Sequence, residues 1–311
     1  MTVMFDAVPV AIADRSGMDE SVHHGIVVAL DADGSVALEV GSIDASIYPR
    51  SSNKPMQADA MVGAGWQPTF EQLALACASH DGTHRHIAVV RATLAAVGLT
   101  PDTLGNTPSL PLNRPAADEV VVAGGTAHPL FMNCSGKHAA MVATCVVNGW
   151  PVDDYLSIDH PLQQAITTRI NELAGSVTHI GVDGCGAPTH ALPLRGLARA
   201  FRTLALERSM VWTAMTSHPD LVAGNLRDAT RIMRAVRGLM AKDGAEGVFA
   251  AALPDGRAAA VKIADGNGRA AGVVLASALA AVGVDVEPAE MGEPIRGHGE
   301  PVGRVRSLIG G

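Results

Sequence analysis

The stretch YPRSSNKPMQ, residues 48–57, places Ser51 three residues before Lys54. A serine hydroxyl becomes a strong nucleophile only when a base removes its proton, and lysine is such a base only when it is neutral. Burial or a neighbouring cation favours neutral lysine, and a spacing of three brings both side chains to one helical face. The alternative is that Ser51 or Ser52 caps the start of a helix while Lys54 is solvated, because the Ser-x-x-Lys pattern is short and common.

A second polar segment, ACASHDGTHRH, ends a predicted helix and offers Ser79, His80, His84 and His86. We expect Ser79 and His80 to line a polar cleft, with the two later histidines facing solvent. The alternative is a metal site built from the three histidines, since imidazole nitrogen is a common zinc ligand.

Two further segments place cysteines beside polar residues. FMNCSGKHAAM contains Cys134, Lys137 and His138, and GVDGCGAP places Asp183 and Cys185 in a glycine-rich turn after a strand. Two cysteines on separate loops could share a Zn²⁺, whereas the spacing alone favours two buried thiols that act as small hydrophobic side chains. From the residues alone, His138 is a better third ligand than Lys137, because neutral imidazole is the commoner zinc donor.

Lys262 lies in the segment AVKIADG, between Val261 and Ile263 on an expected strand. On an edge strand its side chain would be solvated. On a central strand it would be buried and would need a partner, which is the environment in which catalytic lysines are found.

The elements that must position these side chains follow from periodicity and turn residues. Alternating apolar runs around turns at 31–34 and 254–257 predict two β-hairpins, over 25–41 and 247–266. The apolar strand run at 177–182 precedes a glycine-rich loop, and the Pro- and Gly-rich tail after 282 is expected to wrap the surface. Helical patterns cover 54–65, 69–79, 85–98, 138–149, 161–175, 209–224, 225–238 and 271–282. The second of these is expected to begin with a capping box, with Thr69 as the N-cap and Gln72 as its partner.

Strands near both ends with helices between them predict an α/β or α+β fold, with a mixed, partly antiparallel sheet flanked by helices. We expect one domain, 1–311, in which residues 55–150 form a helical lobe. The 311-residue chain is 48% hydrophobic and 17% charged, which is typical of a globular protein with a large core.

Charge and hydropathy exclude several classes of protein. The net charge of -8 and the absence of a Lys/Arg cluster argue against a nucleic-acid partner. No uninterrupted apolar stretch approaches 18 residues, so we expect no membrane span. The first ten residues lack the features of a signal peptide, and four cysteines are too few for a disulfide framework in a chain of this length. We therefore expect a cytoplasmic protein whose reduced thiols are free to bind metal.

Five motifs together resemble the class 3, rhizobial-type, zinc-containing L-asparaginases. They are RSSNKPMQ, ASHDG, NCSGKHAAM, GVDGCGAP and AAVKIADG, and they occur in the family's order over nearly the whole chain. The resemblance implies hydrolysis of L-asparagine to L-aspartate and ammonia, on a fold similar to serine β-lactamases and glutaminases. It also implies a homodimer.

The resemblance further assigns two Ser-Lys pairs that face one pocket, Ser51 with Lys54 and Ser79 with Lys262. Which serine attacks the substrate is left open by this duplication. The expected chemistry is acyl transfer, in which one serine attacks the side-chain amide, ammonia leaves, and water cleaves the β-aspartyl ester. Backbone N–H groups at the helix start near Ser51 are candidate donors to the oxyanion.

A zinc site is also implied by the resemblance. It would consist of Cys134, Lys137, Cys185 and a water molecule, with His138 and Asp183 beside the metal and the substrate. A lysine binds a metal only when deprotonated, so the metal must lower the pKa of that ligand. The chain departs from the family in having Thr83 where glutamate is usual and Ala139 where glycine is usual.

For substrate binding, we expect Arg50 to hold the α-carboxylate, because a guanidinium binds carboxylate in a bidentate manner. Asp183 is expected to hold the α-ammonium, and His80 and His138 complete the predicted substrate contacts. Fixing both groups on the α-carbon predicts a strong preference for asparagine over glutamine.

Two alternatives remain at the level of sequence. A penicillin-binding or β-lactamase-like serine hydrolase would need S-D-N and K-T-G partners to its S-x-x-K, and neither string occurs in the chain. The other is a non-catalytic zinc- or amino-acid-binding protein of the same fold.

Overall fold

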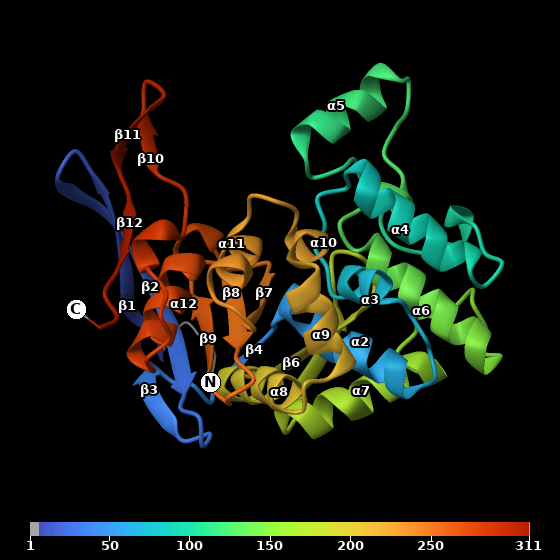
Figure 1. The fold of residues 1–311 in the computed structure, drawn as a ribbon, viewed down its shortest axis with the longest axis horizontal. Coiled ribbons are helices and arrows are strands. Elements are labelled where there is room, and N and C mark those ends of the chain that lie inside the picture. The colour runs from blue at the N-terminus through green and yellow to red at the C-terminus, as the bar shows by residue number, and fades with distance from the viewer. Residues whose placement is uncertain (1–5, 311) are drawn as a thin grey trace.

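The computed structural model describes residues 6–310 (Figure 1). Its main sheet gathers strands from both ends of the chain in the order β12-β1-β2-β9-β8-β7, with β3 also paired to β2. Every pairing among these described strands is antiparallel. The strands are β1 (Val8–Arg15), β2 (Met18–Leu30), β3 (Val36–Val40), β7 (Met240–Gly244), β8 (Val248–Ala252), β9 (Ala258–Ile263) and β12 (Val305–Ser307).

Both predicted hairpins are confirmed. The β2–β3 turn is closed by hydrogen bonds from the Asp31 N–H to the Ser35 carbonyl and from the Gly34 N–H to the Asp31 carbonyl. The β8–β9 turn contains Gly256, whose φ of 99° is a left-handed conformation that favours glycine. Strand β9 is buried along its whole length between β2 and β8, so Lys262 lies at the centre of the sheet.

A helical region lies beside the sheet and covers the middle of the chain (Figure 1). The predicted capping box at Thr69 is confirmed, since Thr69 and Gln72 each accept a hydrogen bond from the other's backbone N–H. Helices α3 and α6 cross closely at Gly136, where a Cβ would lie 2.4 Å from the Leu75 carbonyl oxygen. The helices of this region are α2 (Lys54–Gly63), α3 (Phe70–Ala76), α4 (His84–Ala95), α5 (Arg114–Val122), α6 (Ser135–Asn148) and α7 (Pro161–Ala174).

Other helices pack against the sheet or bridge it to the helical region. Helices α8 (Leu194–Leu206) and α12 (Ala271–Ala281) both contact β2, β8 and β9. Helices α9 (Met210–Ser217) and α11 (Asp228–Ala235) contact β7, with α10 (Pro219–Ala223) between them. This arrangement confirms the predicted fold class, a sheet of antiparallel strands flanked by helices. None of the described helices has the length and apolar character needed to cross a membrane.

A small sheet joins the two regions, in the order β4 (Ser46–Ile47), β6 (Pro188–Pro193) and β5 (His179–Val182). The sequence predicted a glycine-rich loop after the strand run at 177–182, but it did not predict strand β6. The chain turns sharply at Gly186, whose φ is 88°, and the Asp183 N–H bonds to the Ala187 carbonyl. The turn therefore returns the chain beside β5 as strand β6.

The tail also differs from the expectation that it wraps the surface. Strands β10 (Ile295–Gly297) and β11 (Glu300–Gly303) form a hairpin, and β12 then pairs with β1 at the edge of the main sheet. Short 3₁₀ segments complete the described chain: η1 (Arg50–Asn53), η2 (Pro101–Thr103), η3 (Pro129–Phe131), η4 (Gly268–Ala270) and η5 (Pro288–Glu290).

Candidate functional site

Ser51 and Ser79 line the same cavity, which has a volume of about 480 Å³. Ser51 comes from η1, and Ser79 follows the end of α3. The cavity wall also contains the charged residues Asp81, Arg227 and Asp243. The fold therefore brings together the two predicted nucleophiles from separate parts of the chain.

Lys54 is bound to Ser79 in the structure. Its side chain begins α2, is 1% exposed, and donates to the Ala78 carbonyl at 2.5 Å and to the Ser79 Oγ at 3.2 Å. The interpretation of Lys54 as a solvated residue is therefore wrong. The hydrogen bond joins Lys54 to Ser79, whereas the family resemblance paired it with Ser51.

Ser51 occupies a different environment. It follows Arg50, whose φ of 53° is unusual for a residue with a side chain, and such conformations cost about 1–3 kcal/mol. The end of β7 presses on this segment, since a Cβ at Gly244 would lie 2.3 Å from the Pro49 carbonyl oxygen. Within residues 6–310, no hydrogen bond reaches the Ser51 hydroxyl.

Lys262 is buried on the central strand, as one of the two sequence alternatives required. Its Nζ donates to the Glu246 carbonyl and makes no described hydrogen bond to Ser79. Burial lowers the pKa of Lys262, and the charge of Arg50 acts in the same direction, while Glu246 and Asp265 oppose it.

Arg50 and Asp183 bind each other. The Arg50 Nε lies 2.8 Å from the Asp183 Oδ1, and a terminal guanidinium nitrogen lies 2.7 Å from the same oxygen. The Gly184 N–H also donates to this oxygen at 2.8 Å. The two residues expected to hold opposite ends of a substrate's α-carbon are thus adjacent, and their charges compensate each other.

His80 lies behind the cavity, fully buried. Its Nδ1 accepts from the Gly82 N–H at 3.1 Å, so its Nε2 carries the hydrogen and donates to the Ser135 Oγ at 2.9 Å. Burial lowers the pKa of His80 well below its ordinary value, and His86 and Lys54 act in the same direction. His80 therefore supports the loop that carries Ser79 and does not line the cavity.

The three histidines of this segment do not converge. The prediction that His86 faces solvent is wrong, because it is 4% exposed, stacks on His80 at 5.3 Å, and hydrogen-bonds to Thr83. His84 is exposed and contacts Glu119. Among the residues that the structure describes, no group of three or more His, Cys, Asp or Glu side chains is arranged to hold a metal.

The predicted zinc residues nevertheless come together. Cys134, Lys137 and Cys185 are all buried, and the Lys137 Nζ lies 3.1 Å from the Cys185 Sγ. A hydrogen bond with Cys134 lowers the pKa of the Cys185 thiol, against the effect of burial, with Lys137 and His138 adding to the lowering. Cys77 and Cys145 are buried in apolar surroundings, as expected of core thiols.

This donor set fits a zinc ion once the lysine is counted. Two thiols and an amine are ligands that Zn²⁺ accepts, and tetrahedral Zn–S and Zn–N bonds would separate sulfur from nitrogen by roughly 3.6 Å. The observed 3.1 Å is a hydrogen-bond distance, about 0.5 Å shorter than this separation, so the two side chains would have to move apart slightly to hold the ion. In addition, His138 is fully buried with its Nε2 unpartnered, while its Nδ1 lies 2.7 Å from the Tyr155 hydroxyl.

Sequence reasoning missed the charged wall of the serine cavity. Arg227, just before α11, donates to the Ser79 carbonyl at 2.6 Å and to the Asp243 carboxylate. Lys242 is fully buried and donates to the other carboxylate oxygen of Asp243 at 2.7 Å. Burial lowers the pKa of Lys242 to about 8. Burial raises the pKa of Asp243, but Lys242 and Arg227 outweigh it and hold that pKa below its ordinary value.

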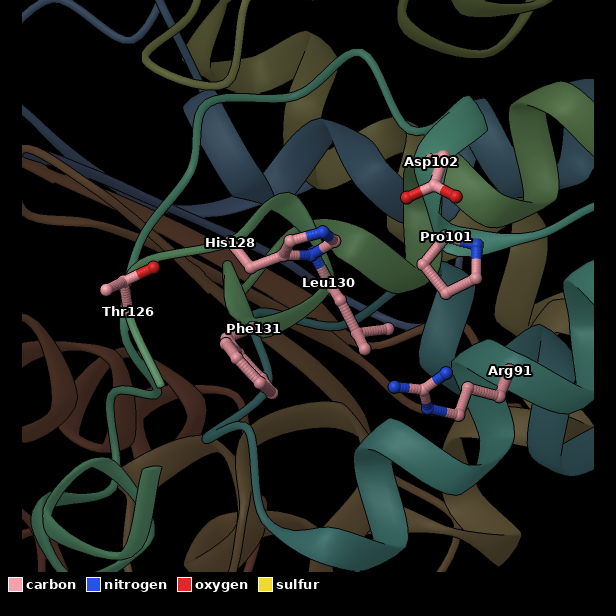
Figure 2. Close-up of a pocket in the computed structure, with 7 residues that line it drawn as sticks. All are labelled: Arg91, Pro101, Asp102, Thr126, His128, Leu130 and Phe131. Carbon is pink, nitrogen blue, oxygen red and sulfur yellow. The ribbon is translucent and has the colours of Figure 1, made fainter. Parts of the chain in front are cut away.

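A second cavity, of about 390 Å³, lies apart from the serines. Figure 2 shows the side chains around it, with Arg91 from α4, Asp102 from η2, and His128 before η3. It contains none of the predicted site residues. Of the residues predicted from sequence to form the site, Ser51 and Ser79 line the serine cavity.

Comparison with solved structures gives a loose likeness. No protein with a curated description matches the sequence. Among solved structures, a candidate β-lactamase from Bacteroides dorei DSM 17855 is similar over 82% of this chain and 93% of its own, with 14% sequence identity and a TM-score of 0.42. A likeness this loose says nothing about activity.

The family comparison is more specific. A family model described as L-asparaginase II matches residues 11–307. That range runs from β1 to β12 and includes both serines, both paired lysines and the buried thiols. The chain therefore belongs to the L-asparaginase II family.

Proposed function

We propose that this protein is an L-asparaginase that hydrolyses L-asparagine to L-aspartate and ammonia through a covalent serine intermediate. The observation that carries this proposal is the contact between Lys54 and Ser79 on the wall of a cavity. Family membership supports an amidohydrolase, and the Ser-Lys contact supplies the nucleophile and base that such an enzyme needs.

The reaction would begin at Ser79. Acting as general base, Lys54 accepts the hydroxyl proton while Oγ attacks the side-chain amide carbon, and the collapsing intermediate takes that proton from Lys54 to release ammonia. Water then attacks the β-aspartyl ester while Lys54 accepts its proton. Lys54 returns this proton to the Ser79 Oγ as the ester C–O bond breaks and L-aspartate leaves. Backbone N–H groups at the start of η1 are candidate donors to the oxyanion, each worth roughly 3–4 kcal/mol.

Ser51 and Lys262 are the remaining members of the two Ser-Lys pairs that the resemblance implies. Ser51 shares the cavity, and Lys262 has a lowered pKa, as a general base requires. The contact with Lys54 favours Ser79 as the attacking residue. Ser51 would then bind the substrate or the attacking water.

We further propose that Cys134, Lys137 and Cys185 hold one Zn²⁺. When bound, the ion would supply positive charge and Lewis acidity beside the substrate. Lys137 would bind it as the neutral amine, and His138 would donate a hydrogen bond next to it. Asp183 lies on the same turn as Cys185 and would form part of the wall of the site on the zinc side.

The remaining assignments begin from the sequence. Arg50 would bind the α-carboxylate, sharing its guanidinium with Asp183, and His80 would act indirectly by holding the Ser79 loop. A cytoplasmic location is proposed from the cysteine content, and a homodimer from the family resemblance.

The test is ammonia release from L-asparagine by the purified protein, combined with intact-mass analysis of the protein during turnover. We expect ammonia and a mass increase of one aspartyl group, both lost in Ser79→Ala. Absence of ammonia and of any adduct in the wild-type protein would refute the proposal and favour a binding protein of the same fold.

A further inference from the structure

Three carboxylates lie at or near the serine cavity, and they differ in how their charge is compensated. Asp243 accepts from Arg227 at one oxygen and from Lys242 at the other. Asp183 is paired with Arg50 at 2.7 Å. Both are therefore already engaged by cations of the protein.

Asp81 is the exception. The guanidinium of Arg227 lies 3.7 Å from the Asp81 Oδ1, which is too long for a hydrogen bond. That guanidinium already donates to the Ser79 carbonyl and to Asp243. Arg227 is therefore a distant ion-pair partner of Asp81, and within residues 6–310 no other ion pair engages this carboxylate.

The position of Asp81 makes this carboxylate available to a substrate. It is two residues after Ser79, lines the same cavity, and has a side chain that is 16% exposed. Its carboxylate lies over Gly224, where a Cβ would come within 1.7 Å of the Asp81 Oδ2. The missing side chain at position 224 therefore provides the space that the carboxylate occupies.

We propose that Asp81 binds the α-ammonium group of the amino-acid amide and so determines the enzyme's specificity for substrates with a free α-amino group. This inference rests on the proposed function and reassigns the ammonium contact from Asp183 to Asp81. An ammonium group offers three donors to a carboxylate whose ion-pair partner Arg227 lies 3.7 Å away, and charge-assisted hydrogen bonds are the strong ones.

The electrostatics of the free protein agree with this role. Burial raises the pKa of Asp81, and the facing groups Arg227 and His86 only partly oppose that effect, while Asp243 adds to it. The ionised carboxylate is thus poorly stabilised until a cation arrives. A substrate ammonium would supply the missing compensation.

The experiment compares L-asparagine with succinamic acid, which is the same amide without the α-amino group. In Asp81→Asn, the ratio of kcat/KM for L-asparagine to that for succinamic acid should fall roughly 10- to 100-fold, mainly through KM for L-asparagine. An unchanged ratio would overturn the inference.

Two matched variants separate this role from others. Asp243→Asn weakens the hold on Arg227, which donates to the Ser79 carbonyl, and should lower kcat/KM for both substrates alike. Asp183→Asn should also leave the ratio near its wild-type value. If Asp183→Asn lowers the ratio and Asp81→Asn does not, the ammonium binds at Asp183 and the inference is wrong.

Stability and pH give a readout that a merely structural role would not. A carboxyl whose pKa is raised by folding favours the folded state when protonated, and that contribution is lost as pH rises through the folded pKa. At neutral pH, Asp81→Asn should therefore keep or raise the Tm while it weakens the binding of L-asparagine. In the wild type, kcat/KM for L-asparagine relative to succinamic acid should fall as acid protonates Asp81, at a pH above the ordinary aspartate range. In Asp81→Asn, this fall with pH should be absent. A lower Tm together with an equal loss of kcat/KM for both substrates would indicate that Asp81 has a structural role.

Failure of the proposed function would look different, since the wild type would then hydrolyse neither amide. In that case, calorimetry with L-aspartate and succinate would still decide the inference. Asp81→Asn should weaken the binding of L-aspartate and leave the binding of succinate nearly unchanged. Equal effects on the two affinities would overturn the inference.

Discussion

The two serines share one cavity but lie on walls of different character. On the helical side, every polar group of Ser79 is engaged: its N–H donates to the Val222 carbonyl at 3.0 Å, its carbonyl accepts from Arg227, and its hydroxyl lies 3.2 Å from Lys54. On the sheet side, Ser51 follows a left-handed arginine and has a hydroxyl that no described group binds.

This difference separates a fixed group from an adjustable one. A nucleophile gains from being held in one geometry before substrate arrives, because misplacement of reacting atoms costs heavily in rate. A hydroxyl without a protein partner is free to turn toward a ligand or a water molecule. The comparison therefore favours Ser79 over Ser51 as the attacking residue of the proposed reaction.

The largest expected effect tests this assignment directly. Ser79→Ala should lower kcat roughly 10³-fold or more, because it removes the attacking atom, while Ser51→Ala should cost much less. The measurement is ammonia release under saturating L-asparagine, with circular dichroism to verify folding. The reverse order of the two variants would make Ser51 the nucleophile, and full activity in both would end the serine mechanism.

The two lysines provide the next test. Lys54→Met keeps the length of a buried side chain but removes the base beside Ser79, so we expect a loss of about 10²- to 10⁴-fold in kcat. Lys262→Met should reduce kcat less, because Lys262 donates to the Glu246 carbonyl and not to Ser79. A larger loss in Lys262→Met would shift the catalytic pair to the sheet side of the cavity.

The same contrast shows what could be predicted from sequence. The hairpins, the helix that begins at Lys54 and the capping box at Thr69 follow from local patterns, and they are correct. The hydrogen bond between Lys54 and Ser79 spans 25 residues, and the i, i+3 rule that pointed to Ser51 could not find it. Strand β6 was missed because its pairing depends on a turn at Gly186.

The charged wall was missed for a related reason. Arg227 and Asp243 come from segments with no recognised motif, and only the packing of α11 against β7 brings them to Ser79. His86 was misplaced because it lies in the first turn of α4, whose inward face is set by the tertiary contact with His80. Composition and periodicity carry no information about such contacts between distant segments.

Substrate length sharpens the comparison further. If the α-carbon is anchored near Ser79, glutamine carries its amide carbon about 1.3 Å beyond the position reached by asparagine, because it is one methylene longer. We expect kcat/KM for asparagine to exceed that for glutamine by well beyond about tenfold. Parallel assays of ammonia release from both amides check this. Comparable turnover of the two amides would mean that the α-carbon can be held in more than one position. It would also mean that substrate can bind beside either serine.

The smallest effect is expected at the buried thiols, beside the serine cavity. Cys185→Ser should lose most of the bound zinc, which is measured by elemental analysis, because Lys137 and Cys134 alone make a poor site. Since serine supplies the nucleophile in the proposed reaction, the variant should retain turnover at high substrate, with KM raised about tenfold, equivalent to roughly 1.4 kcal/mol of binding. Cys145→Ser, which replaces a core thiol in α6, is the matched control and should keep one zinc per chain. Undiminished zinc in Cys185→Ser would exclude that residue as a ligand. Complete loss of turnover at every substrate concentration would place the metal in the chemical step itself, and the division of labour between a fixed serine and a positioning metal would then fail.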